Sequence, residues 1–181
     1  LGATRDELEA ALAKGYEATV EELLHPEAQP DLDYDLIYRF YPDVKEAREI
    51  DVTQSMWLYR MINTRRPLEE KMALFWHCLF ATAFNKSNHA QMLEIQVDMF
   101  RRLCLGNSRD ILVELSRDPS MIFWLDNQEN TTDVHNENFG RELLELFAMG
   151  IGNYTEDDVK NCARAFTGWT LKNPIPGAQP F

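Results

Sequence analysis

Residues 67–84 constrain the fold more than any other stretch, because a helix there would be apolar around most of its circumference. One side carries a stripe at helical spacing, made of Leu68, Met72, Phe75, Trp76, Leu79, Phe80 and Ala83. The opposite side is hardly more polar and consists of Ala73, Leu74, Cys78 and Ala81. A helix of this kind is buried on most sides. We therefore expect it at the centre of the domain, with Pro67 at its first position.

The rest of the chain also shows helical periodicity, interrupted by capping residues, glycines and prolines. Thr4 and Glu7 have the spacing of a capping box, and Thr155 starts the last helix in a similar way. The expected helices cover residues 4–13, 16–24, 34–41, 44–63, 67–84, 88–105, 107–117, 118–125, 138–149 and 155–167. No segment alternates in the manner of a strand. We predict an all-α fold, an irregular multi-helix bundle of about nine or ten helices with no sheet.

The domain limits follow from where this periodicity stops. We expect one helical domain over residues 1–172 and an extended tail over residues 173–181, which is rich in proline. The chain opens on Leu1 and shows no signal peptide, so we expect a processed product or a fragment. It has no run of about 18 apolar residues, so we expect no membrane span. Its net charge of -12 argues against nucleic acid as a partner, because binding to phosphates rewards basic surfaces.

The helix expected over residues 138–149 carries the main candidate for chemistry. Asn138, Glu142 and Glu145 form a polar stripe, and Arg141 lies one helical turn before Glu145. Two carboxylates one turn apart can ligate a metal or act as acid and base where an apolar wall excludes water. The alternative is a solvated face with an Arg141–Glu145 pair of little energetic weight. The spacing alone favours the solvated face.

His77 is the second candidate, because it lies within the most apolar helix and a buried imidazole needs a partner. A functional interpretation pairs it with Glu142 or Glu145 in a site between helices, which His135 would close. Together, His77, Glu142 and His135 are then candidate ligands of a divalent metal. The alternative is a core histidine bonded to a backbone carbonyl. The sequence has no HExxH or ExxH motif. Its three cysteines, Cys78, Cys104 and Cys162, lack the spacing of a zinc finger and are expected as buried free thiols.

A polar loop precedes the candidate helix and offers another possible metal site. Residues 126–138 are rich in carboxylates and amides, whose oxygens suit calcium. The spacing of these residues does not match an EF-hand, which makes a calcium site the weaker interpretation.

Three blocks of the sequence resemble the bacterial family known as domain of unknown function 1800. They are RPLEEKMALFWH at residues 66–77, the short motifs LGN, RDP and LDN at residues 105–107, 117–119 and 125–127, and a third block at residues 136–169. The third block contains NENFGRELLELF, GIGNYTEDDV and ARAFTGW. Residues 2–4 also resemble the start of the family, GAT.

The chain departs from the family pattern at two places. Cys78 and Leu79 stand where the family usually has a polar pair, which removes a second histidine from the suspected site. Gly140 replaces a usual alanine, at a cost of about 0.5–1 kcal/mol in helix preference. The resemblance implies a longer domain that continues past the GW motif, and a bacterial protein exported to the periplasm, cell surface or exterior. It implies no reaction.

Two classes of function therefore remain open. The first, which we favour, is an exported binding or assembly module in a bacterial cell-surface or extracellular complex. Its partner would be another protein or the remaining C-terminal part of its own domain. The second is a hydrolase or metal-assisted enzyme that uses His77, Glu142 and Glu145, with Arg141 and Asn138 orienting them. The first is favoured because no complete catalytic constellation is visible.

Overall fold

All secondary structure in the computed structural model, which describes residues 2–40 and 49–171, is helical. The described residues form 11 α-helices: α1 (Arg5–Lys14), α2 (Tyr16–Leu24), α3 (Asp35–Phe40), α4 (Ile50–Asn63), α5 (Pro67–Leu79), α6 (Phe84–Ser87), α7 (Ala90–Leu103), α8 (Ser108–Leu115), α9 (Pro119–Trp124), α10 (Asn138–Glu142) and α11 (Glu156–Ala165). The all-α prediction is confirmed, with a count slightly above the expected one.

Some expected features cannot be compared with the structure. The first part of the helix expected over residues 44–63 and the tail expected over residues 173–181 lie outside the described residues. The domain limit at residue 172 stays a prediction. None of the described helices is both long and apolar enough to cross a membrane.

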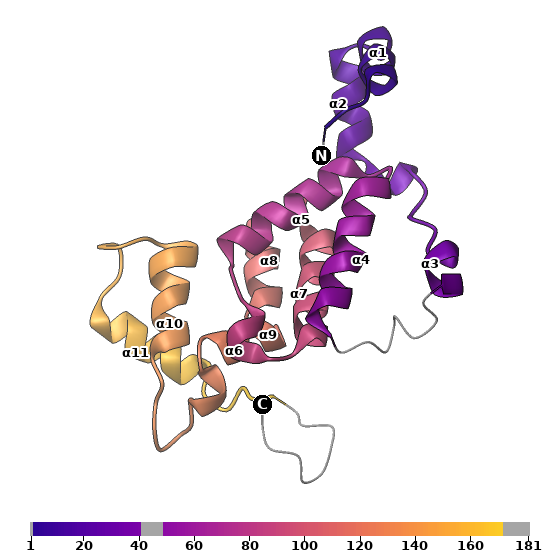
Figure 1. Ribbon diagram of the computed structural model, residues 1–181. Coiled ribbons are helices and arrows are strands. Elements are labelled where there is room, and N and C mark those ends of the chain that lie inside the picture. Colours follow the sequence, from indigo (N-terminus) through magenta and orange to yellow (C-terminus); the bar gives the residue numbers. More distant parts are fainter. Residues whose placement is uncertain (1, 41–48, 172–181) are drawn as a thin grey trace.

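The helices α5 and α7 lie side by side at the centre, and α4 packs against both (Figure 1). The hairpin of α1 and α2 extends from one end of α5, while α10 and α11 form a pair on the other side of the molecule (Figure 1). The core is built where α5 and α7 meet α8, α9 and α10. Its buried residues are Ala73, Phe80, Met99, Phe100, Ile111, Leu115, Met121, Leu125 and Phe139.

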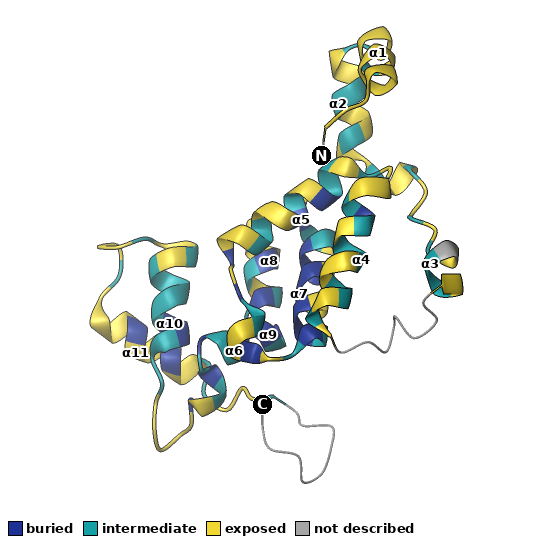
Figure 2. Cartoon of the chain, in the orientation of Figure 1, coloured by how far each residue is buried: buried dark blue, intermediate teal, exposed yellow. Residues whose placement is uncertain are grey.

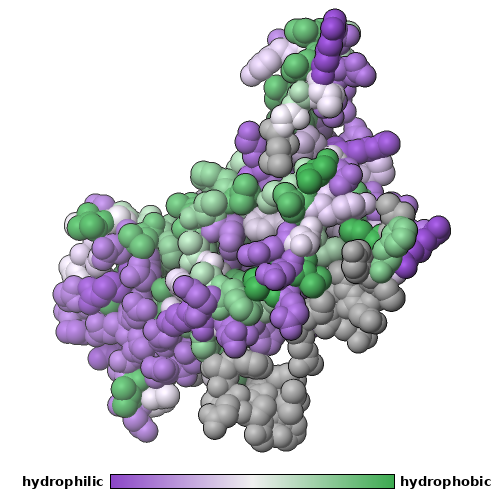
Figure 3. All heavy atoms as spheres, viewed as in Figure 1, coloured by the Kyte–Doolittle hydropathy of each residue, from purple (hydrophilic) through white to green (hydrophobic). Residues whose placement is uncertain are grey.

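The helix buried along most of its length is α7, as Figure 2 shows. Seven of its residues are buried: Ala90, Met92, Leu93, Gln96, Val97, Met99 and Phe100. The expectation that α5 would be buried on most sides was wrong. Phe75 and Leu79 are each about half exposed, Cys78 is exposed, and hydrophobic residues gather on the surface over α5 (Figure 3). One apolar side of α5, which carries Leu74, Phe75 and Leu79, therefore stays exposed within the described part of the chain.

The pair of α10 and α11 depends on close packing at Gly140. A Cβ at this position would lie 3.1 Å from the amide nitrogen of Ala163 and 3.3 Å from the carbonyl oxygen of Val159. Both Val159 and Ala163 are fully buried beneath it. The glycine is therefore a packing requirement of this pair and not merely a weak helix former. After α10 the helix widens into a π-helical segment, η4 (Leu143–Ala148), and Gly150 and Gly152 turn the chain with positive φ.

Candidate functional site

His77 lies among residues of α4 and α7. Its ring meets Trp57 edge-on at 5.4 Å between ring centroids and lies 6.5 Å from Phe100. Burial lowers the pKa of His77, and a hydrogen bond to Gln96 partly opposes this effect. The Nδ1 atom is buried and has no hydrogen-bond partner among the described residues. The structure therefore favours a neutral, partly buried imidazole packed between α4 and α7.

Gln96 links His77 to a buried carboxylate. Its side-chain amide donates to Asp118 Oδ1 at 2.8 Å, and its carbonyl oxygen accepts from the Thr82 hydroxyl at 2.6 Å. Asp118 also caps α9 by accepting from the amide of Met121 at 2.8 Å. Burial raises the pKa of Asp118 to about 6, while these hydrogen bonds act in the opposite direction. The chain of bonds joins α7 to the start of α9 and to Thr82 in the segment between α5 and α6.

The predicted stripe on α10 and η4 faces a different set of partners. Arg141 pairs with Glu156 of α11 at 2.7 Å and with Glu137 at 3.3 Å, rather than with Glu145. Glu145 accepts a hydrogen bond from the Tyr154 hydroxyl at 2.7 Å.

The other two members of the stripe differ in how they are held. Asn138 donates to the carbonyl oxygen of Leu125 at 3.2 Å, which anchors the start of α10. Within the described part of the chain, Glu142 has no hydrogen bond or ion pair.

The structure thus places the predicted catalytic and metal residues in separate surroundings. The interactions of His77 involve α4 and α7, whereas those of the stripe involve Leu125, α11 and the turn that ends at Tyr154. His135 is exposed in the loop before α10. Across residues 2–40 and 49–171, no group of three or more His, Cys, Asp and Glu side chains could hold a metal ion, so His77, Glu142 and His135 do not gather as one. Their catalytic roles stay predictions.

The amides of the polar loop hold the end of α11. Asn130 is buried, and its side-chain amide donates to the backbone carbonyl oxygen of Ala163 at 2.7 Å. The backbone carbonyl oxygen of Asn130 accepts from the Gly168 amide at 3.0 Å. Asn127, also buried, donates to the carbonyl oxygen of Phe166 at 3.3 Å. These bonds connect the polar loop to the end of the third sequence block.

A buried charge network that the sequence analysis did not single out lies between α4, α5 and α7. Its centre is Glu70, which is only 3% exposed. Glu70 accepts from Arg60 Nε, from Arg101 Nε at 2.6 Å and from the indole nitrogen of Trp57 at 3.1 Å. A buried carboxylate needs such partners, because an isolated charge in the interior is strongly disfavoured. The only sequence signal was an acidic pair, Glu69 and Glu70, at the start of a very apolar helix.

Arg60 extends this network toward the segment before α3. Its Nη1 donates to the Tyr34 hydroxyl at 2.8 Å, and its Nη2 donates to Asp31 at 2.9 Å and to Glu69 at 3.3 Å. The Arg60 side chain is nearly buried by these contacts. The guanidinium group therefore fixes the position of Tyr34 relative to α4.

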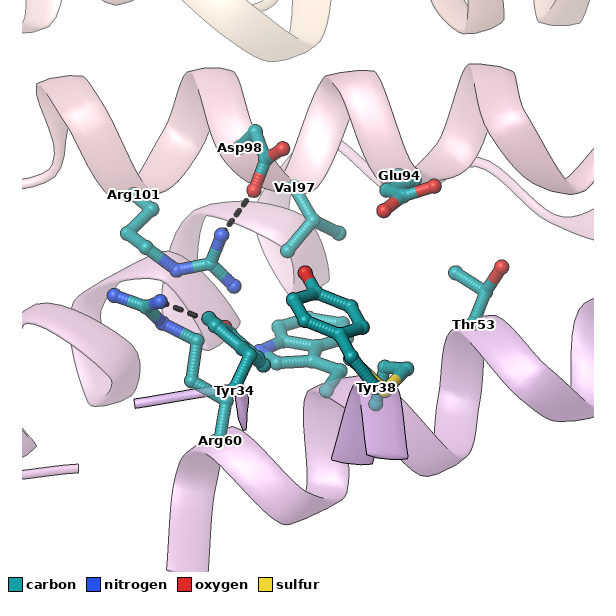
Figure 4. Close-up of a pocket in the computed structure, with 10 residues that line it drawn as sticks. Tyr34, Tyr38, Thr53, Arg60, Glu94, Val97, Asp98 and Arg101 are labelled. Atoms are coloured by element: carbon teal, nitrogen blue, oxygen red, sulfur yellow. Dashed lines mark hydrogen bonds and ion pairs between the residues drawn. The ribbon is translucent and has the colours of Figure 1, made fainter. Parts of the chain in front are cut away.

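A cavity of about 290 Å³ opens next to this network, between α3, α4 and α7 (Figure 4). It is lined by Tyr34, Tyr38, Thr53, Met56, Trp57, Arg60, Glu94, Val97, Asp98 and Arg101. Figure 4 shows Glu94 and Asp98 on one helix, above the tyrosine rings, and Thr53 and Arg60 on the helix opposite. The cavity thus combines aromatic walls with charged groups of both signs.

Glu94 is the charged group of this cavity that has no close partner. Asp98 and Arg101 form an ion pair, whereas no hydrogen bond or ion pair of Glu94 is found in the part of the chain that the structure describes. Burial raises the pKa of Glu94, the nearby charge of Asp98 raises it further, and Arg101 acts in the opposite direction. Perturbed carboxylates in a cleft are typical of binding and catalytic sites.

Comparison with protein-family models matches residues 1–180 to the family described as "Protein of unknown function (DUF1800)". The match spans nearly the whole chain and confirms the resemblance inferred from the three sequence blocks. No curated protein and no solved structure matches the chain.

Proposed function

The chain belongs to the DUF1800 family, and we propose that it is a binding module that holds a small ligand in the cavity between α3, α4 and α7. The observation that carries the proposal is the convergence of aromatic and charged side chains from three helices on one cavity. Its volume of about 290 Å³ is near the lower end of the range for small-molecule sites, roughly 300–1,000 Å³. Its lining has the composition of such sites, in which apolar and aromatic walls surround a few convergent polar groups.

The network around Glu70 supports the proposal, because it makes one side of the cavity rigid. Arg60 and Arg101 line the cavity, and both are held by the same buried carboxylate. Trp57 is held there too, through its indole nitrogen. A site whose side chains are fixed before the ligand arrives loses less conformational entropy on binding.

We propose binding rather than catalysis on the chemistry of the lining. The cavity offers carboxylates, but its described lining residues include no serine, cysteine or histidine, and the hydroxyl of Thr53 has no hydrogen bond to a base among the described residues. His77, the strongest sequence candidate for a base, interacts with Trp57, Gln96 and Phe100 in the core. Both features favour the binding class of function over the hydrolase class.

The cellular setting is part of the proposal and is supported by the sequence resemblance alone. We propose that the module acts outside the bacterial cytoplasm, in a cell-surface or extracellular complex. Fractionation of cells that express the full-length protein tests this point. Recovery of the protein only from the cytoplasm would refute it.

The ligand-binding proposal can be tested with a blocked cavity. Saturation-transfer NMR with a fragment set of amines, carboxylates, sugars and heterocycles should give signals with the unmodified protein. Thr53→Trp, which places a large ring in the cavity, should abolish them, whereas Gln54→Trp on the exposed side of α4 should not. Circular dichroism of both variants should show the helical signal of the unmodified protein, which serves as the control for folding. The proposal is refuted if no fragment binds, or if the bound fragments are indifferent to Thr53→Trp.

A further inference from the structure

We infer that the cavity between α3, α4 and α7 recognises an organic ammonium group, such as a primary amine or a lysine-like side chain. The inference rests on the proposed function, because it names the chemical class of ligand for the same cavity. It is drawn from three features of the lining: how the guanidinium groups are used, where negative charge remains, and which rings face the cavity.

Anionic ligands are disfavoured because the two guanidinium groups are already engaged. Each of the three nitrogens of Arg60 donates to a carboxylate or to the Tyr34 hydroxyl. Each of the three nitrogens of Arg101 donates to Glu70 or Asp98. An incoming carboxylate or phosphate would have to compete with these internal acceptors. Neither arginine therefore offers the unoccupied fork that recognition of such anions uses.

The charge that remains available is negative. Glu94 and Asp98 lie four residues apart on α7, so they are neighbours on one face of the helix and repel each other. Arg101 is paired with Asp98 and reaches Glu94 only as a more distant charge. A cation in the cavity would relieve this repulsion and give Glu94 the partner that it lacks within the described residues.

Aromatic rings complete a cation site. The Tyr34 and Tyr38 rings lie 5.9 Å apart, centroid to centroid, and both line the cavity with the ring of Trp57. Faces of Tyr and Trp attract cations through their ring quadrupoles, and aromatic cages with carboxylates are the usual receptors for ammonium groups. A neutral sugar could also stack on these rings, but it would leave the repulsion between Glu94 and Asp98 unchanged. The ammonium group therefore fits the lining better.

The inference is tested by isothermal titration calorimetry of the full chain at low ionic strength. The probes are cadaverine, its neutral analogue pentanediol, its anionic analogue glutarate, and glucose. Cadaverine should bind about tenfold more tightly than any other probe, because only it gains from both the carboxylates and the rings. Glu94→Gln should weaken cadaverine binding about tenfold without changing the affinity for pentanediol, since the substitution removes charge and not shape. Added salt should weaken cadaverine binding as well.

Two further variants make the result specific. Asp98→Asn should also weaken cadaverine binding, whereas Glu17→Gln on the exposed side of α2 should leave it unchanged. The inference is overturned if pentanediol, glutarate or glucose binds as tightly as cadaverine, or if cadaverine binds Glu94→Gln and the unmodified protein equally. In those cases the fragment experiment with Thr53→Trp shows separately whether a ligand occupies the cavity, and so whether the binding module stands. Absence of cadaverine binding also overturns the inference, and the fragment experiment with Thr53→Trp then decides separately whether the cavity binds any ligand.

Discussion

Replacing Glu70 by glutamine should destabilise the protein more than any change at its surface. Each carboxylate oxygen accepts from two donors: Oε1 from Arg60 and Arg101, and Oε2 from Trp57 and Arg101. A glutamine keeps one oxygen and turns an NH₂ group toward two donors, so two of these bonds are lost. Hydrogen bonds to charged groups contribute about 1.5–3 kcal/mol each, which gives about 3–6 kcal/mol for the two. Breaking a buried ion pair independently suggests about 3–5 kcal/mol.

The assay is urea denaturation followed by circular dichroism. With a slope of about 2 kcal/mol per molar urea, a loss of about 4 kcal/mol moves the midpoint by about 2 M. The matched control is Glu9→Gln, which removes the exposed i,i+4 pair with Arg5 and should leave the midpoint unchanged within error. A loss below about 1 kcal/mol for Glu70→Gln would refute the reasoning, since it would mean that water already solvates this carboxylate.

A double variant separates lost attraction from a stranded charge. In Glu70→Gln the guanidinium of Arg101 stays largely buried, and its remaining partner is Asp98. Adding Arg101→Met removes that charge while keeping most of the side-chain volume. The double variant should therefore be more stable than Glu70→Gln alone, because an uncompensated buried charge costs more than an apolar replacement of the pair. If the losses of stability measured for Glu70→Gln and for Arg101→Met alone simply add up in the double variant, this account is wrong.

Two further substitutions test other parts of the fold. Gly140→Ala should destabilise the protein by about 1–3 kcal/mol although alanine is the better helix former, because the added methyl meets the backbone of α11 at 3.1 and 3.3 Å. A rise in the urea midpoint would show that α10 and α11 can separate freely. Asp118→Asn should keep the cap of α9 and the bond from Gln96 while removing a pH dependence. The pKa of Asp118 is raised from 3.8 to about 6, so the folded state favours the protonated acid, and its contribution is present below pH 4 and lost as pH rises to about 6. At 1.36 kcal/mol per pKa unit, this shift amounts to about 3 kcal/mol. The stability of the asparagine variant relative to the unmodified protein, measured by urea midpoints, should therefore rise by about that amount between pH 4 and pH 7. A difference that stays constant over this range would refute the raised pKa of Asp118.

Local signals predicted the helices and their caps well. The capping boxes at Thr4 and Thr155 are both formed, with the side chains of Glu7 and Asp158 returning to the cap residues as the spacing indicated. A capping box is defined within four residues, so its geometry needs no knowledge of the rest of the fold.

Features that depend on neighbours distant in sequence were not predictable in this way. The apolar circumference of α5 indicates what could be buried, but whether Phe75 and Leu79 are covered depends on which helices reach them. Arg141 has an acidic residue one turn away in Glu145, yet it pairs with Glu156, 15 residues along the chain. The bond between Arg101 and Glu70 spans 31 residues. Spacing on one helix cannot rank such partners against each other.

The buried network and the proposed ligand class are linked through a residue that does not line the cavity. Glu70 lies behind the wall and binds both Arg60 and Arg101, the two cationic groups that face the cavity, whose other nitrogens are bound by Asp31, Glu69, Tyr34 and Asp98. Without that carboxylate, Arg101 would keep only Asp98 as a partner, and the lining would offer more unpaired guanidinium nitrogens to an anion. With it, Glu94 and Asp98 set the sign of the field that a ligand meets. The buried carboxylate of Glu70 therefore affects which ligand charge the cavity favours, although Glu70 does not line the cavity. The lining residues alone, which include two arginines, would suggest an anionic ligand.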